Sequence, residues 1–234
     1  DSTSSRGLGD VYKRQVTTGV DFEGLFFRNI GCKLAILLLL NLRSKHYICR
    51  KETPMLKAGV LGAGHLGKIH LKLLQQSTKY TLVGFFDANQ EAAEAIEQEY
   101  GYKSFPTMEA LIQACDMVDV VTPTIHHYKC AEKVITAGKH LFIEKPITHT
   151  VAQADIIRDL AKKNGVRGQV GQVERFNPAF MAVNHMIDKP MFIEAHRLAE
   201  FNPRGTDVSV VLDLMIHDID CLLYTSDAAD DSDC

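Results

Sequence analysis

Two short motifs of this chain hold side chains of the types that transfer protons. Asp213, His217 and Asp220 stand four and three residues apart, so on a helix a carboxylate, an imidazole and a second carboxylate share one face. Lys145 is the centre of a Glu-Lys-Pro motif at 144–146. When a secondary alcohol loses a hydride its hydroxyl proton must leave too, and histidine has the near-neutral pKa that this base needs. A lysine ammonium beside it would stabilise the developing alkoxide.

Each of these residues also has an ordinary structural interpretation. Lys145, which precedes a proline, could be a surface lysine with a packed stem, and His217 could be a core histidine with satisfied hydrogen bonds. Asp213 lies one turn before His217 and could orient a substrate hydroxyl or polarise the imidazole. Because both motifs are expected at one cofactor cleft, we interpret Lys145, His217 and Asp213 as catalytic.

A glycine-rich turn is the first element that must position these groups. Residues 55–67, MLKAGVLGAGHLG, form a short apolar strand that ends in Gly62-x-Gly64-x-x-Gly67. Such a turn needs its first glycine for the bend, its second for backbone approach to a pyrophosphate, and its third for close packing of helix on strand. Apolar residues then recur at spacings of three and four, which predicts a helix whose first amides face the phosphates.

The next apolar segment, 80–86, ends at Asp87, twenty residues after Gly67. A carboxylate at this position would accept both hydroxyls of an adenosine ribose, which favours NAD as the cofactor and leaves NADP possible. The competing interpretation is a tight turn of another α/β protein followed by a chance aspartate.

Alternating segments after Asp87 predict a doubly wound parallel sheet. Helices are expected over 89–100, 108–114 and 130–137, and strands over 119–121 and 140–143. Ligands gather at the carboxyl ends of such strands. The residues predicted to bind the cofactor are Gly62, Gly64, His65, Leu66, Gly67, Asp87, Thr122, Pro123, His127, Glu144 and Lys145. His65 and His70 have an alternative interpretation as residues that face solvent or pack near the first turn of the helix. His127 has one as a cap of the helix after Thr122 and Pro123.

The character of the sequence changes after a helix expected over 150–164. Strands over 168–173 and 191–201, with a helix over 177–188 between them, predict a second, mainly antiparallel sheet. A further helix is expected over 210–220.

The fold class is therefore α/β, with a second, truncated α+β domain. We predict a dinucleotide-binding domain of the Rossmann type over 55–148 and part of a substrate-binding domain over 149–220. Arg175, near the start of the second domain, could bind an anionic substrate group such as a diphosphate, and a surface ion pair explains it nearly as well. With Asp213 and His217, Arg175 completes the predicted substrate-binding set.

Both ends of the chain contain segments whose sequences do not resemble those of natural folded proteins. Residues 4–15 and 221–231 back-translate into what resemble two inverted ends of a transposon-based sequencing adapter. We therefore expect 1–54 to be adapter and upstream translation, and 221–234 to be adapter translation. The apolar run at 34–42 is about half the length that a membrane helix needs, and basic residues follow it instead of preceding it as in a signal peptide, so no membrane role is expected.

Composition and charge limit the partners. The 234 residues are 46% hydrophobic and 24% charged, as in ordinary soluble proteins. The net charge of -3 becomes +1 without the four aspartates of 221–234, so no nucleic-acid footprint is expected. Between 55 and 220 the only cysteines are Cys115 and Cys130. Their spacing predicts neither a metal site nor a disulfide framework and favours a reducing, cytoplasmic location.

Taken in order, four landmarks resemble the Gfo/Idh/MocA family of NAD(P)-dependent oxidoreductases over residues 55–220. They are the glycine turn at 62–67, Thr-Pro-Thr at 122–124 with His127, the Glu-Lys-Pro motif, and the 213–220 motif. The resemblance implies that Lys145 lies near nicotinamide and substrate, and that Asp213 and His217 orient a sugar and exchange its proton. It also implies a homo-oligomer in the full-length protein.

The runs at 173–178 and 206–217 look like the branch of this family that oxidises nucleotide sugars, notably the 3-hydroxyl of UDP-N-acetylglucosamine. Residues 209–211, Ser-Val-Val, stand where many relatives carry a glycine pair. This difference weakens any inference of the substrate from the sugar and inositol dehydrogenases. The leading hypothesis is a sugar or nucleotide-sugar dehydrogenase. The alternative is a non-catalytic dinucleotide sensor or scaffold, and the presence of both Lys145 and His217 argues against it.

Overall fold

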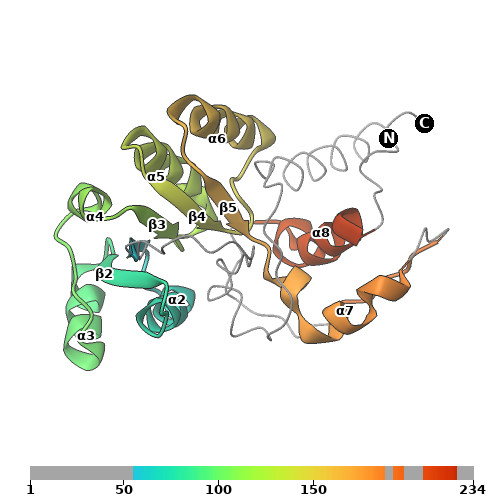
Figure 1. Cartoon of the computed structure of the whole chain (residues 1–234), viewed down its shortest axis with the longest axis horizontal. Coiled ribbons are helices and arrows are strands. Elements are labelled where there is room, and N and C mark those ends of the chain that lie inside the picture. Colours follow the sequence, from blue (N-terminus) through green and yellow to red (C-terminus); the bar gives the residue numbers. More distant parts are fainter. Residues whose placement is uncertain (1–54, 188–191, 198–207, 226–234) are drawn as a thin grey trace, which may run out of the picture.

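Five short strands form one parallel sheet in the order β2-β1-β3-β4-β5 (Figure 1). The computed structural model describes residues 55–187, 192–197 and 208–225. The strands are β1 Leu56–Leu61, β2 Tyr80–Phe86, β3 Met117–Val120, β4 His140–Glu144 and β5 Gly168–Gly171. Because β2 lies on one side of β1 and β3 to β5 on the other, the strand order reverses between β1 and β3, where α/β sheets bind ligands. The predicted parallel sheet is confirmed.

The helices between these strands begin and end where local sequence signals indicate. They are α2 His65–Gln75, α3 Gln90–Tyr100, α4 Met108–Ala114, α5 Thr124–Thr136 and α6 Val151–Asn164. The side chains of Asn89, Thr107 and Thr150 accept backbone N–H bonds at the starts of α3, α4 and α6. Helix α5 begins six residues before the predicted start at 130, because the fixed φ of Pro123 leads directly into its first turn.

Apolar side chains pack on both faces of the sheet. One buried cluster joins the sheet to α4, α5 and α6, and the other joins it to α2 and α3 (Figure 1). Along β3, Val118 and Val120 belong to the first cluster, and Met117 to the second. Asp119 has the same parity as Met117, so this carboxylate faces α2 from the middle of a buried strand.

Strand β5 corrects the prediction that 168–173 opens an antiparallel sheet. It pairs in parallel with β4, from Leu141 opposite Gly168 to Glu144 opposite Gly171. Helix α6 is the crossover that returns the chain in the same direction. The predicted domain boundary at 148 therefore falls inside the first sheet. The described residues 192–197 form no strand, and the remainder of the predicted strand at 191–201 lies outside the described residues.

After β5 the chain follows a series of short turns. These are the 3-10 turns Val173–Phe176 and Asn184–Met186, helix α7 Pro178–Val183, the π-helical turn Val211–Met215, and helix α8 Ile216–Thr225. The helix predicted over 177–188 ends at Val183, and the one predicted over 210–220 is divided into a π turn and an α-helix. Helix α8 packs against the turn at 173–176, next to the carboxyl end of the sheet (Figure 1).

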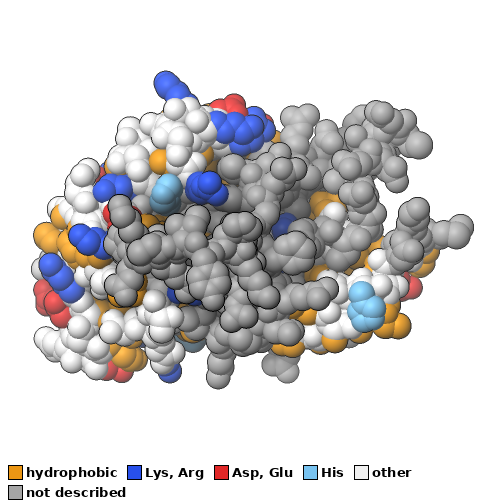
Figure 2. Space-filling view, in the orientation of Figure 1, with side chains coloured by type: hydrophobic (Ala, Val, Ile, Leu, Met, Phe, Trp, Pro, Cys, Tyr) orange, Lys and Arg blue, Asp and Glu red, His pale blue; other side chains and the backbone are white. Residues whose placement is uncertain are grey.

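The described helices and surface charges have ordinary properties. Across the described ranges, the helices are all too short or too polar to cross a bilayer. Basic and acidic side chains are interspersed on the visible face of these residues (Figure 2). The residues expected to come from adapter or upstream translation, 1–54 and 226–234, lie outside the described part, whereas 221–225 complete α8.

Candidate active site

The glycine-rich turn between β1 and α2 has the close contacts expected of a phosphate-binding turn. Gly62 has a φ of 91° and a Cβ there would lie 2.8 Å from the Val121 carbonyl oxygen. A Cβ on Gly67 would lie 2.0 Å from the Gly62 carbonyl oxygen, so this glycine allows the helix to pack on the turn. A Cβ on Gly64 would meet nothing within 4 Å, which leaves that side of the turn open for a ligand.

The first turn of α2 presents backbone N–H donors beside Gly64. Among the described residues no side chain caps this helix, and its first turn contains no acidic residue. Unsatisfied amides and the positive end of a helix dipole together favour an anion. His65 and Leu66 are both exposed at this end, and 43% of Leu66 is accessible. The turn therefore fits the pyrophosphate of a dinucleotide.

Asp87 lies at the carboxyl end of β2 and is bonded to the glycine turn. Its Oδ2 accepts the Ala63 N–H at 2.7 Å, and its Oδ1 accepts the Asn89 N–H at 2.9 Å. A carboxylate oxygen accepts two hydrogen bonds, so each oxygen keeps a lone pair for a ribose hydroxyl. The sequence indicated the ribose site but not this second function, which is to hold the turn against the end of β2.

His127 has a different position from the two that the sequence suggested. It is 1% exposed, with Nδ1 2.8 Å from the Pro146 carbonyl oxygen and Nε2 2.8 Å from the Thr122 carbonyl oxygen. Burial lowers its pKa, so the ring is neutral and donates to one of these carbonyls at a time. His127 therefore joins the loops after β3 and β4 and neither caps α5 nor presents a free nitrogen to a cofactor. Thr122 lies next to Gly62 at the same end of the sheet, and Pro123 follows it in the chain.

Lys145 and Asp213 are brought together although 68 residues separate them in the sequence. Lys145 follows β4 directly and donates from Nζ to the Asp213 carbonyl oxygen at 2.7 Å and to its Oδ1 at 3.0 Å. The lysine side chain is 18% exposed and that of the aspartate 35%. Lys145 is thus not a surface lysine, and the two motifs predicted to converge do so.

His217 lies one turn after Asp213 in a half-buried position. Burial lowers the pKa of its imidazole, and the nearby charge of Lys145 acts in the same direction. Its Nδ1 is buried and has no hydrogen-bond partner among the described residues. The ring is therefore neutral near pH 7 and able to accept a proton.

Asp220 and Arg175 are bound to each other. Asp220 is 1% exposed, and its two oxygens accept from Nε and Nη2 of Arg175. Of the two interpretations of Arg175, an anionic substrate group or an ion pair, the structure supports an ion pair, with a buried carboxylate as the partner. Asp220 lies about two turns beyond Asp213 and binds Arg175, whereas Lys145 binds Asp213. The π turn at 211–215 also changes the angle between successive side chains from that of a regular α-helix.

The sequence interpretation missed a buried group formed by His70, Asp119 and Glu144. His70 is 4% exposed, not solvent-facing, with Nδ1 2.8 Å from Asp119 Oδ2 and Nε2 3.4 Å from Glu144 Oε1. The sequence does contain a signal, which is an aspartate inside the otherwise apolar strand 117–120. Glu144 was assigned to the cofactor, and the structure places its carboxylate on His70.

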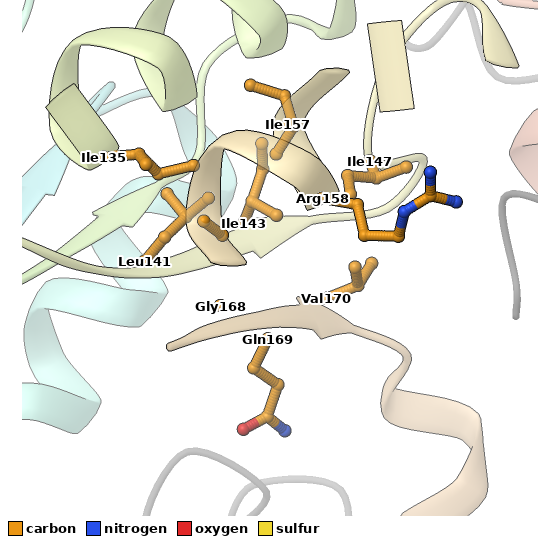
Figure 3. A pocket seen from close by; sticks show the side chains of 10 residues that line it. Ile135, Leu141, Ile143, Ile147, Ile157, Arg158, Gly168, Gln169 and Val170 are labelled. Carbon is orange, nitrogen blue, oxygen red and sulfur yellow. The ribbon is translucent and has the colours of Figure 1, made fainter. Parts of the chain in front are cut away.

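A small cavity elsewhere in the molecule does not contribute to this site. About 20 Å³ in volume, it lies between α5, α6, β4 and β5 and is lined by Ile135, Leu141, Ile143 and Ile157 (Figure 3). The Arg158 guanidinium points away from these side chains and binds Asp155 and Asp159. An apolar space of this size is a packing gap, not a ligand site. Among the described residues no group of side chains could hold a metal ion.

The fold and this site together define a nucleotide-binding oxidoreductase domain. A family model described as "Oxidoreductase family, NAD-binding Rossmann fold" matches residues 56–172. The chain belongs to this family, Gfo/Idh/MocA, which is the family that its sequence motifs resemble.

Several relatives of the chain have names that assign them to sugars or cyclitols as dehydrogenases. UDP-N-acetylglucosamine 3-dehydrogenase of Acidithiobacillus ferrooxidans is 37% identical over 174 residues, which are 74% of this chain and 55% of that protein. A solved structure of that enzyme has a TM-score of 0.68 and 36% identity, covering 75% of this chain and 58% of the other. Inositol 2-dehydrogenase of Rhizobium meliloti is 34% identical over 69% of this chain and 52% of its own length. The chain spans about half the length of the curated relatives it matches.

Proposed function

We propose that the protein is a dehydrogenase that transfers a hydride between NAD and a secondary hydroxyl of a sugar or nucleotide sugar. The observation that carries this proposal is the ion pair of Lys145 with Asp213 beside the neutral His217, at the carboxyl end of a sheet with a phosphate-binding turn. A sensor needs the turn but neither base nor ammonium, and the named relatives lend the non-catalytic alternative no support.

Each of the three side chains has a distinct task in this proposal. His217 accepts the hydroxyl proton, for which its lowered pKa keeps it available near neutral pH. Lys145 has three N–H donors and uses two of them on Asp213, which leaves one for the substrate oxygen as negative charge develops there. Asp213 fixes the ammonium and orients a neighbouring hydroxyl. Bound NAD would supply the hydride acceptor.

The cofactor residues in this proposal are the ones that the geometry leaves accessible. The open side of Gly64, the first amides of α2 with His65 and Leu66, and the loop at Thr122 and Pro123 would hold the dinucleotide. Asp87 would accept the ribose hydroxyls through its remaining lone pairs, which favours NAD over NADP.

Within this class we propose a nucleotide sugar as substrate, with the 3-hydroxyl of UDP-N-acetylglucosamine as the first candidate. The support is the relative named for that reaction, at 37% identity. We also propose a homo-oligomer of the full-length protein in a reducing cytoplasm, in keeping with the free thiols of Cys115 and Cys130.

The test is formation of NADH by the full chain with a matched panel of substrates. UDP-N-acetylglucosamine, UDP-glucose, N-acetylglucosamine and myo-inositol separate the need for a nucleotide from the need for an acetamido group. We expect turnover to be fastest with UDP-N-acetylglucosamine. Binding of NAD, measured by calorimetry, without turnover of any member would overturn the dehydrogenase proposal in favour of a sensor.

A further inference from the structure

His70 is a buried histidine that faces the sheet from the middle of α2. Its ring contacts two carboxylates from neighbouring strands, Asp119 of β3 at 2.8 Å and Glu144 of β4 at 3.4 Å. The edge of the same ring packs on Phe142, with ring centroids 6.2 Å apart. None of these contacts involves the residues of the proton-transfer site, yet Glu144 is the immediate neighbour of Lys145.

This group is a costly one to bury, because it puts two acids and one base into the core. Burial by itself lowers the pKa of His70, but Asp119 and Glu144 together outweigh burial and raise that pKa to about 10. Burial also raises the pKa of Asp119, whose Oδ1 has no hydrogen-bond partner among the described residues. Apolar residues of similar volume would commonly give at least equal stability at such a position. The group therefore calls for an explanation beyond stability.

The carboxylate of Glu144 is held from three directions. His70 contacts its Oε1, and its Oε2 accepts the Lys145 backbone N–H at 3.2 Å. On the remaining side lies Gly171 of β5, where a Cβ would approach Oε1 to 2.6 Å. Only glycine fits at position 171 without displacing the carboxylate.

We propose that His70 is a positioning residue for Lys145 and acts through Glu144. The imidazole holds the Glu144 carboxylate, the carboxylate holds the Lys145 peptide, and the peptide directs the ammonium to Asp213. A helix on one face of the sheet thereby determines where the proposed catalytic lysine lies. The inference rests on the proposed function for its consequence in catalysis, but the positioning itself is a property of the protein without substrate.

Two substitutions of His70 separate the contact with Glu144 from the contact with Asp119. His70→Asn places an amide near the former Nδ1, so it can keep Asp119 and loses Glu144. His70→Gln places an amide near the former Nε2 and can keep Glu144. If His70 positions Lys145, kcat of His70→Asn is lower than that of the wild type by up to about a hundredfold, as expected for a displaced catalytic group. The kcat of His70→Gln should lie much closer to that of the wild type. KM for NAD stays within about twofold because the glycine turn is untouched.

A second measurement tests the positioning without any turnover. The full-length protein, free of cofactor, is treated with an amine-reactive reagent, and labelling of each lysine is followed by peptide mass spectrometry. We expect Lys145 to react slowly in the wild type, faster in His70→Asn, and slowly again in His70→Gln. Lys133, which is paired with Glu109 on the surface, is the internal reference. His126→Asn, a substitution of an exposed histidine on α5, is the matched control variant.

The outcomes separate failure of this inference from failure of the proposed function. If the wild type turns over no sugar but Lys145 labelling responds to His70→Asn and recovers in His70→Gln, the positioning stands and the dehydrogenase proposal falls. The two His70 variants could instead show equal changes in Lys145 labelling and in kcat, with both changes in proportion to a fall in melting temperature. In that case His70 is only a packing residue, and the inference is overturned. Unchanged labelling in His70→Asn also overturns it.

Discussion

The Nζ atom of Lys145 lies 2.7 Å from the carbonyl oxygen of Asp213 and 3.0 Å from its carboxylate. One residue follows a strand of the parallel sheet, and the other lies in the π turn that leads into α8. Because these contacts use the main chain as well as the side chain of Asp213, they hold the turn at 211–215 and the ammonium in one relative position. The conformation of the turn at 211–215 and the position of the Lys145 ammonium therefore depend on each other.

The first prediction concerns the charge of Lys145. Lys145→Met removes the ammonium at nearly the same length, and we expect kcat to fall by about 10² to 10³, the range found when one donor to a developing oxyanion is lost. Binding of NAD, measured by calorimetry, changes little because the glycine turn and Asp87 are intact. Lys145→Arg replaces the ammonium by a guanidinium, which keeps the positive charge, and is the matched control. Equal turnover of Lys145→Met and the wild type would remove Lys145 from the mechanism.

The second prediction is the pH dependence that His217 imposes. Only the neutral imidazole accepts a proton, and burial together with Lys145 lowers its pKa below the usual 6.5. The kcat/KM of the wild type should therefore stay constant as pH falls to 6.5 and decrease only below it, as the ring becomes protonated. His217→Gln should lower kcat by about 10² to 10⁴ and abolish this acid limb. An unchanged acid limb in His217→Gln would assign the base to another residue.

The third prediction compares two glycines of the same turn. Gly67→Ala places a Cβ 2.0 Å from the Gly62 carbonyl oxygen, so the turn or α2 must shift and the melting temperature falls. Gly64→Ala meets nothing within 4 Å, and its φ of -62° suits alanine, so the variant melts like the wild type. It should nevertheless weaken NAD binding by about tenfold or more, because the methyl group occupies the side from which a pyrophosphate approaches. Normal NAD affinity in Gly64→Ala would place the cofactor elsewhere.

Most of the fold up to β4 follows from local sequence signals. The glycine spacing from Gly62 to Gly67, the caps at Asn89 and Thr150, and the short apolar strands each predict an element within a few residues. Strand β5 was assigned to the wrong sheet because it has only four residues, begins and ends with glycine, and gives no local sign of its direction. Direction depends on which edge the crossover helix returns to, which is a property of the whole sheet.

The sequence points to side chains of unusual chemistry in the candidate site, and it misses those that are recognised only by the partner they contact. Lys145, Asp213 and His217 are identified by the chemistry that their side chains can perform. His70 contacts a partner 49 residues away, and Arg175 one 45 residues away, which no local pattern reveals. Asp220 was placed on one face with Asp213 and His217 on the assumption of a regular α-helix, whereas the structure has a π turn before α8.

The fourth prediction concerns the stability of the segment that carries the site. Asp220 is almost fully buried and bonded by both oxygens to Arg175, so Asp220→Ala leaves the guanidinium without its main counter-ion. We expect the free energy of unfolding to fall by about 3 kcal/mol, as for other broken buried pairs. Asp218→Ala, which breaks the more exposed pair with Arg197, is the matched control and should cost less than about 1 kcal/mol. Urea unfolding of both variants gives the comparison, and equal losses would contradict it.

The fifth prediction is a loss of stability in alkali that originates at His70. Its pKa in the folded protein is raised to about 10 from 6.5, so the folded state binds this proton more tightly than the unfolded chain does. The stabilisation is complete below pH 6.5 and is lost as pH rises through about 10. Asp119, whose pKa is also raised, changes stability in the same direction.

His70→Asn cannot take up that proton, so its melting temperature should depend less on pH than that of the wild type. The difference between the two proteins should shrink by about 5 °C or more between pH 7 and pH 10.5, a shift that corresponds to a few kcal/mol for a chain of this size. Subtraction of the two curves removes the contributions of groups that titrate in alkali without contact to this cluster, such as Cys115. Melting curves followed by circular dichroism at matched ionic strength provide the measurement. Parallel curves for the two proteins would show that His70 is uncharged in the fold and that Asp119 and Glu144 hold it as a neutral ring.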